Sequence, residues 1–320
     1  MEDIFVGIDL GGTNIQGASG TPHGNIIQRG KIPTRAALGA ETVIDDIAQL
    51  IFDLAQGREI KAVGMGVPGL LDLEKGVCVF SGNLNWRDIP VVSLLSAKVG
   101  APVFMDNDVR VAALGELAQG KARDCQDFIY LTVGTGIGSG IFIAGELLRG
   151  SHGVAGEVGH MVLDPQGPAC TCGSRGCLEA LASATAIARE GRAAAASSPE
   201  SLLNQLATNP QDIDAALVFQ AAGQGDATAT QVVDTAMNWL GVGIASLVNI
   251  FNPRLVVIGG GVALAGEKLL APVRNQVGKY GMQVQKETVE IVTSALADSA
   301  GVEGGLELCR RQSQIYSNNK

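Results

Sequence analysis

The sequence predicts an α/β protein of two domains, on three observations. Its 320 residues are enough for two domains of ordinary size. Apolar residues make up 46% of the chain and charged residues 17%, and the mean hydropathy is +0.24, as in a globular protein with a large core. Strands followed by helices and further strands occur twice, and the segments VGIDLGGTNIQGA and YLTVGTGIGSGIF share one strand–turn–strand plan.

The first half of the chain is expected to open as a β-meander. Strands at 4–10, 14–20 and 25–33 are separated by turns at 11–13 and 21–24, the second of which contains His23. Apolar residues at helical spacing then predict a helix over 41–55. The elements expected after it are a buried strand at 61–67, a helix at 91–99, a short strand at 103–105 and a helix at 107–118.

The second half restarts the pattern near Asp127, with a strand at 128–133, a glycine-rich turn at 134–140 and a return strand at 141–144. Residues 128–145 hold no charged side chain, but their glycines, threonines and alternation favour this hairpin over a membrane span. The later elements are helices at 183–196, 212–223, 228–250, 268–279 and 302–316, strands at 254–258 and 289–292, and a polar surface connection at 197–210. We expect a small domain of residues 1–119 plus 302–320 and a large domain of residues 120–301.

Charge and cysteine content narrow the function classes. A net charge of −9 and a pI of about 4.9 argue against a protein that binds the nucleic-acid backbone. A nucleotide is still allowed, because glycine-rich loops bind phosphate through backbone N–H groups. The acidic start enters a strand directly, without a secretory signal. Six cysteines, three of them clustered near a histidine, fit a reduced cytoplasmic protein that holds zinc.

A compact candidate metal site lies between Glu157 and Glu179. It consists of His160, Cys170, Cys172 and Cys177. Thiolate and imidazole ligands suit tetrahedral zinc, and three or four protein ligands leave little or no open position, which favours a structural ion over a catalytic one. The alternative is three chance cysteines in a loop, with one disulfide.

Three glycine-rich turns are candidates for nucleotide binding. The residues concerned are Asp9, Gly11, Gly12, Thr13, Gly134, Thr135, Gly136, Gly259, Gly260 and Gly261. The first two turns could hold phosphates, with Asp9 binding Mg²⁺ through water, and the third could lie against a base or ribose. Each of these segments could also be an ordinary turn without a ligand. Because the first two have the same strand–turn–strand plan, the pair indicates phosphate binding more strongly than either turn alone.

Two polar segments are candidates for sugar chemistry. Asp106, Asn107 and Asp108 stand where a helix begins, so one of them is an N-cap or one Asp is a general base that accepts a proton from a hydroxyl. Residues 81–86 combine two asparagines with Trp86, which suits a sugar or a turn with a buried indole.

Six motifs together resemble the ROK family, which groups bacterial sugar kinases and sugar-responsive repressors. They are Asp9-Leu-Gly-Gly-Thr13, Asn83-Leu-Asn-Trp86, Asn107-Asp108 with Ala112-Ala-Leu-Gly-Glu116, Gly134-Thr-Gly-Ile-Gly138, Gly156-Glu-Val-Gly-His160 and Cys170-Thr-Cys-Gly-Ser-Arg-Gly-Cys-Leu-Glu179. The resemblance covers nearly the whole chain, in family order. It implies an actin-like, ribonuclease-H-like ATPase fold, with two domains around a nucleotide–sugar cleft.

The resemblance also implies an activity and a site. The activity is ATP-dependent phosphorylation of a hexose at its 6-hydroxyl, in carbohydrate metabolism and glycolysis, with Asp108 as the base. Sugar hydroxyls would bind Asn83, Asn107, Asp108, Glu157, His160 and Glu179. The three glycine turns would hold ATP, and the His–Cys₃ cluster a structural zinc. A homodimer or higher homo-oligomer is expected, with no nucleic-acid or membrane partner.

One residue departs from the family pattern, and several readings stay open. Arg110 stands where many family kinases have Asn, and we expect it on the helix flank. Glucose is the leading substrate, with N-acetylmannosamine, fructose and allose as alternatives. A sugar-sensing regulator is a second hypothesis, although the family's repressors carry a helix-turn-helix before the first glycine hairpin, which begins here at Asp9. A chaperone-like or filament ATPase is disfavoured by the sugar and zinc motifs.

Overall fold

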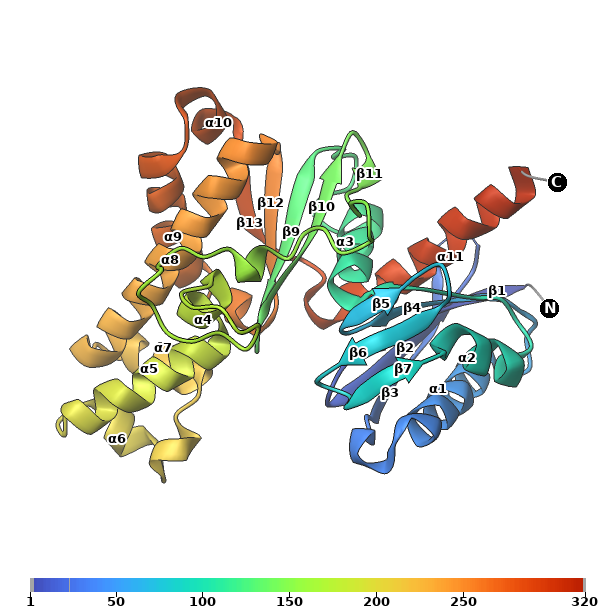
Figure 1. The fold of residues 1–320 in the computed structure, drawn as a ribbon, viewed down its shortest axis with the longest axis horizontal. Coiled ribbons are helices and arrows are strands. Elements are labelled where there is room, and N and C mark those ends of the chain that lie inside the picture. The colour runs from blue at the N-terminus through green and yellow to red at the C-terminus, as the bar shows by residue number, and fades with distance from the viewer. Residues whose placement is uncertain (1–2, 23, 319–320) are drawn as a thin grey trace. The chain divides into compact units, whose positions relative to one another are not determined.

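The structure is a computed structural model that describes residues 3–22 and 24–318 (Figure 1). His23, expected in a turn, lies outside the described residues. The chain forms two units. Unit 1 comprises Met1–Asp124, Leu147–Ala155 and Ala295–Lys320, and unit 2 comprises Cys125–Glu146 and Gly156–Ser294.

Unit 1 is built on a five-stranded sheet of order β3-β2-β1-β4-β8. The strands are β1 (Ile4–Leu10), β2 (Asn14–Gly20), β3 (Ile26–Pro33), β4 (Ile60–Val67) and β8 (Val103–Asn107). The first three pair antiparallel, as the predicted meander requires. Strand β4 is parallel to both β1 and β8, so these three strands end at the same edge of the sheet.

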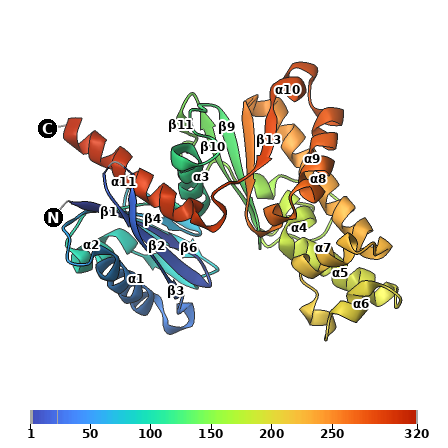
Figure 2. The ribbon, with the colours of Figure 1, turned by 180° about the vertical axis from the view of Figure 1, so that it is seen from behind.

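Helices cover both faces of this sheet. Alternate residues of β1 point to opposite sides, because side chains alternate along a strand. Ile4, Val6 and Ile8 pack with α1 (Ala40–Ala55) and α2 (Val91–Val99), whereas Phe5 packs with Val302 and Leu306 of α11 (Ala300–Asn318). Figure 2 shows α11 running along the sheet beside α3 (Asp108–Gln119).

The approach of α11 to its neighbours depends on glycines. A Cβ on Gly304 would lie 1.6 Å from the carbonyl oxygen of Val111 in α3, and one on Gly64 would lie 2.1 Å from the carbonyl of Gly305. No real side chain fits at such distances. Residues of the predicted closing helix thus pack on the first strands of the chain.

A small sheet in unit 1 was missed by the sequence prediction. Strands β5 (Leu70–Asp72), β6 (Val77–Ser81) and β7 (Trp86–Ile89) form a meander of order β5-β6-β7. They are only three to five residues long, so their pairing leaves little periodicity in the sequence. Residues 82–85 are the turn between β6 and β7, and Trp86 is 2% exposed in the core.

Unit 2 contains a second five-stranded sheet, of order β11-β10-β9-β12-β13. Its strands are β9 (Phe128–Val133), β10 (Ile137–Ile143), β11 (Glu146–Leu147), β12 (Leu255–Gly259) and β13 (Glu290–Thr293). The expected hairpin is confirmed, but its return strand begins at Ile137 rather than at residue 141, because Gly138 and Gly140 pair with β9. The glycine turn is therefore limited to residues 134–136.

All four helices expected in unit 2 are confirmed, with ends that differ by up to three residues. They are α5 (Ala184–Ser197), α7 (Ala215–Gly223), α8 (Ala227–Phe251) and α9 (Glu267–Tyr280), with the short α4 (Leu178–Ala182), α6 (Leu202–Leu206) and α10 (Gln283–Thr288) in addition. Helix α6 lies in the expected surface connection, and its first N–H groups are bonded by the Ser201 hydroxyl and the Asp226 carboxylate. Among residues 3–22 and 24–318, no helix combines the length and apolarity needed to cross a membrane.

The two units differ from the predicted domain limits at 120–124, 147–155 and 295–301, which all belong to unit 1. For the segment Leu147–Ala155 the reason is a set of polar bonds. Arg149 pairs with Asp106 at 2.5 Å, and Arg110 of α3 donates to the carbonyls of Gly153 and Ala155, both at 2.6 Å.

Candidate functional site

Carboxylates gather at the edge of unit 1 where β1, β4 and β8 end. Asp9 of β1 stands opposite Gly66 of β4, which stands opposite Asp106 of β8. Burial raises the pKa of Asp9 from 3.8 to about 7, and the negative charges of Asp108 and Asp298 add to the effect. Gly301 leaves space for this carboxyl group, since a Cβ there would lie 2.4 Å from Cγ of Asp9. The edge thus favours a bound cation.

The three polar residues 106–108, where α3 begins, have different roles in the structure. Asn107 is the N-cap of α3, because its Oδ1 accepts the N–H groups of Val109 at 3.1 Å and Arg110 at 3.4 Å. Asp106 is 1% exposed and pairs with Arg149. Asp108 is the half-buried first residue of α3, where the helix dipole favours a carboxylate.

Arg110 does not lie on the flank of α3 as expected. Its side chain is 5% exposed, 3.6 Å from Asp106, and bonded to two backbone carbonyls. The expectation was wrong because the segment Leu147–Ala155, distant in the sequence, covers this side of α3.

The first glycine turn lies beside the candidate sugar residue Asn83. Gly12 and Thr13 are exposed, while Thr34 donates its hydroxyl to the carbonyl of Gly11 at 2.7 Å and its N–H to that of Thr13 at 2.8 Å. A Cβ on Gly12 would lie 3.2 Å from Cβ of Asn83. Trp86 is 2% exposed, so its indole is unavailable to a sugar.

The second glycine turn, in unit 2, is hydrogen-bonded to the first residues of α5, which follow the metal loop in the chain. The carbonyl of Gly134 accepts the N–H of Ala184 at 2.8 Å, and that of Thr135 accepts the hydroxyl of Thr185 at 2.7 Å. Oε2 of Glu179 accepts the N–H of Ile137 at 3.0 Å. These bonds place a candidate sugar ligand directly against a candidate phosphate loop.

A cavity of about 750 Å³ opens next to this turn in unit 2. Phe219 of α7 and Leu264 near the start of α9 give it apolar walls, while Arg192 and Lys268 supply positive charge. Of the three candidate glycines 259–261, only Gly261 lines it; a Cβ on Gly259 would lie 2.3 Å from the Tyr130 hydroxyl. The sequence prediction did not include the side chains at 192, 219, 264 and 268, because they belong to no local motif.

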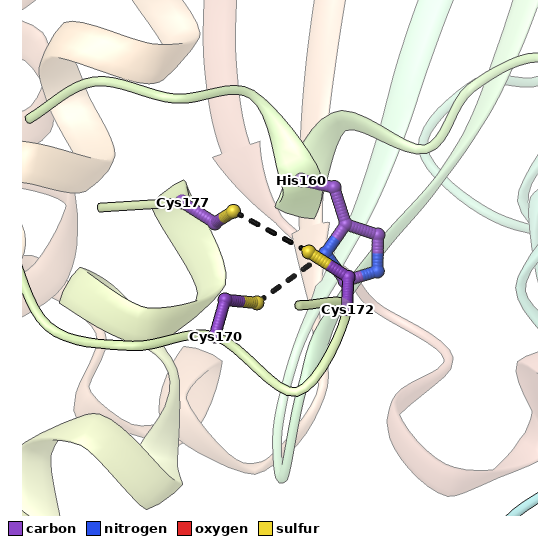
Figure 3. Close-up of side chains that lie close together, drawn as sticks. All are labelled: His160, Cys170, Cys172 and Cys177. Carbon is purple, nitrogen blue, oxygen red and sulfur yellow. Dashed lines mark hydrogen bonds between the residues drawn. The ribbon is translucent and has the colours of Figure 1, made fainter. Parts of the chain in front are cut away.

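The His–Cys₃ cluster is assembled as the spacing predicted (Figure 3). The four ligand atoms lie within 4.8 Å of one another, with 3.6 Å between Sγ of Cys170 and Nδ1 of His160 and 3.7 Å between the sulfurs of Cys172 and Cys177. A tetrahedral zinc with ordinary bond lengths places two sulfurs about 3.8 Å apart and sulfur and nitrogen about 3.6 Å apart. The residues therefore fit zinc, and the cysteines form no disulfide.

The metal loop is closed by backbone contacts as well. The carbonyl of Gly176 accepts the N–H of Leu163 at 2.8 Å, and Gly176 has a φ of +63°. A Cβ at this position would lie 1.5 Å from the carbonyl oxygen of Asp164, so only glycine fits. The exposed Glu157 immediately precedes the short helix Val158–His160, which brings it onto the same loop as the cluster.

Comparison with known proteins agrees with these motifs. Residues 5–312 match the description of the ROK family. The chain is 40% identical to a glucokinase of Thermotoga maritima over 309 residues, covering 96% of this chain and 98% of that protein. Its fold matches a ROK family glucokinase from Streptomyces griseus, solved with glucose and AMPPNP, with a TM-score of 0.84, 33% identity and coverage of 96% and 99%.

A regulator is also similar. The structure of a ROK family transcriptional regulator, a homolog of the E. coli MLC protein, matches with a TM-score of 0.86 and 27% identity. The match covers 97% of this chain but 78% of the regulator.

Proposed function

The chain belongs to the ROK family, and from this premise we propose how it acts as an ATP-dependent glucose kinase. The named relatives and the neighbour solved with glucose and AMPPNP support phosphoryl transfer from ATP to glucose. The observation that supports the residue roles best is Asp108 itself. It stands at a helix N-terminus, next to a capping Asn107 and at the same sheet edge as Asp9.

We assign Asp108 the role of general base. Its carboxylate takes the proton from the sugar 6-hydroxyl while the bond from that oxygen to the γ-phosphorus forms and the bond to ADP breaks. The N-terminal position on α3 fixes the carboxylate on a rigid element. Asn107 uses Oδ1 as the cap, so its contact with the sugar would come from the Nδ2 amide group.

We assign sugar binding to the six residues that the family motifs imply. They are Asn83, Asn107, Asp108, Glu157, His160 and Glu179. His160 turns Nδ1 toward Cys170, which leaves Nε2 for a hydroxyl. Oε2 of Glu179 accepts the N–H of Ile137, the residue directly after the second glycine turn, so Oε1 is the atom assigned to the sugar.

We assign the cavity of unit 2 to the base of ATP, and the two glycine turns to its phosphates. Phe219 and Leu264 offer apolar surface to the base, and backbone N–H groups of 11–13 and 134–136 suit phosphate oxygens. Mg²⁺, when bound, would neutralise phosphate charge. Asp9 is suited to hold it through water, because a cation favours the ionised form of a carboxyl whose pKa is raised to about 7, first by burial and then by the charges of Asp108 and Asp298.

A structural zinc in the His–Cys₃ cluster would fix the loop that presents Glu157, His160 and Glu179. Metal analysis should find about one zinc per chain. Cys172→Ser should lose it and weaken sugar binding, whereas Cys125→Ser, at a buried cysteine outside the cluster, should keep it. A fully active protein without zinc would refute this assignment.

The test of the catalytic proposal is a coupled assay of ADP release with Mg-ATP and a panel of hexoses. Asp108→Asn should lower turnover by about three orders of magnitude while glucose binding persists. Asp53→Asn, at an exposed carboxylate of unit 1, is the control. Unchanged turnover in Asp108→Asn would remove the base role. Sugar binding without turnover in the unaltered protein would favour the regulator hypothesis.

Three further properties stay predictions of the sequence. They are a homodimeric or larger assembly, a cytoplasmic location, and a place in glycolysis. Analytical ultracentrifugation tests the first directly.

A further inference from the structure

The strongest unexplained feature of unit 1 is a buried arginine next to the proposed base. Arg110 follows Asp108 by two positions and is 5% exposed. A buried guanidinium is costly unless its N–H groups are bonded and its charge is offset. Both conditions are met here, because two carbonyls accept from it and Asp106 lies 3.6 Å away.

The two carbonyls belong to one short segment. Nη1 donates to Gly153 and Nη2 to Ala155, each at 2.6 Å, so the planar fork spans alternate residues of the backbone. Glycines with positive φ punctuate this segment at 150, 153 and 156. These glycines allow the backbone several conformations, so hydrogen bonds from other residues are needed to hold the segment in one of them.

Asp106 orients the guanidinium that makes these bonds. Its Oδ1 accepts the backbone N–H of Asn107 at 2.8 Å, and its Oδ2 pairs with Arg149 at the start of the segment, at 2.5 Å. One buried carboxylate is therefore bonded to the strand end before the base and to Arg149 of the segment, and it lies beside Arg110, which contacts the same segment.

The segment matters because it leads directly into unit 2. The chain passes from unit 1 to unit 2 between Ala155 and Gly156. On the unit 2 side, the carbonyl of Gly156 accepts the hydroxyl of Ser139 at 2.6 Å. The junction is thus bonded on both sides, and the next residue is the proposed sugar ligand Glu157.

We infer that Arg110 is a positioning residue that fixes the segment ending at Ala155 to the helix bearing the base, and so holds the backbone that leads directly into the proposed sugar ligand Glu157. This inference rests on the proposed roles of Asp108 and Glu157. Ser139 is the second clamp on the same junction. Arginine is required rather than lysine, because a single ammonium group cannot span two carbonyls in this geometry.

The test is Arg110→Lys, which retains the charge beside Asp106 and loses the fork. Loss of a charge-assisted bond should raise the glucose KM at least about tenfold and lower kcat, while the KM for ATP stays within about twofold. Hydrogen–deuterium exchange of the peptide spanning 150–157 should accelerate. Arg35→Lys, at an exposed arginine paired with Asp46, is the matched control and should change neither readout.

Ser139→Ala gives a second test that leaves the ion pairs intact. It should raise the glucose KM in the same direction, so the inference is still tested if Arg110→Lys does not fold. Normal glucose kinetics in either folded variant, or equal increases in the KM for ATP and glucose, would overturn the inference, as would unchanged exchange at 150–157. If Asp108→Asn shows that the base assignment is wrong, exchange and calorimetric glucose binding still decide whether the clamp exists.

Discussion

The carboxyl group of Asp9 should make the ligand-free protein less stable as the pH rises. Burial raises its pKa to about 7, from an ordinary value of 3.8. Between these two values the folded state holds a proton that the unfolded state has released, so the free energy of unfolding falls with increasing pH. The loss is complete above about pH 7 and absent below about pH 4. Asp9→Asn removes it, because an amide of the same size carries no charge.

The size of the effect follows from the two pKa values. Their difference corresponds to about 4 kcal/mol at most, and partial exposure of the side chain reduces this to about 2 to 4 kcal/mol. At pH 8 the variant should therefore unfold about 5 to 15 °C above the unaltered protein, for a unit of this length. At pH 4 the two midpoints should coincide.

Thermal and urea unfolding from pH 4 to 8 measures this difference. Asp53→Asn, at an exposed carboxylate of unit 1, should follow the unaltered protein throughout. Saturating Mg-ATP should narrow the gap at pH 8, because a cation favours the ionised form that only the unaltered protein has. A difference in unfolding midpoint that stays constant across the pH range, or a variant less stable than the unaltered protein at pH 8, would refute the raised pKa of Asp9.

Three other predictions test the packing and the site. Gly304→Ala should destabilise unit 1 by about 3 kcal/mol or more, whereas Gly278→Ala, in open space on α9, should stabilise by about 1 kcal/mol; similar urea midpoints for both would contradict the close packing of α11. Phe219→Ala should raise the KM for ATP about tenfold with an unchanged KM for glucose; an unaltered KM for ATP would place the base elsewhere. Glu179→Gln should raise the glucose KM about tenfold with zinc retained, and a normal KM would remove its sugar contact.

Local patterns in the sequence were sufficient for most of the regular structure. The meander at the start, the helix α1 and the hairpin β9–β10 were predicted because their periodicity and glycine turns act within a few residues. The His–Cys₃ cluster was predicted for the same reason, since its ligands lie in one short loop.

Elements that depend on pairing with distant segments were harder to predict. Gly138 and Gly140 look like turn residues, but they lie in β10 because β9 supplies their partners. The strands β5, β6 and β7 are too short for a pattern to emerge, and α6 begins where Asp226 bonds the N–H of Leu202 from another part of the chain.

By itself the sequence determined the family motifs, the candidate base and the metal ligands, because each is a property of residue type at short spacing. Only the tertiary structure decided that Trp86 is buried and that Asn107 is the cap beside Asp108. It also decided that Asp9 is a buried carboxyl group with a raised pKa. It also decided that Arg110 faces inward to hold carbonyls 43 and 45 residues later in the chain. Burial and charge are set by the groups that pack against a residue, and for these residues the packing partners come from elsewhere in the chain.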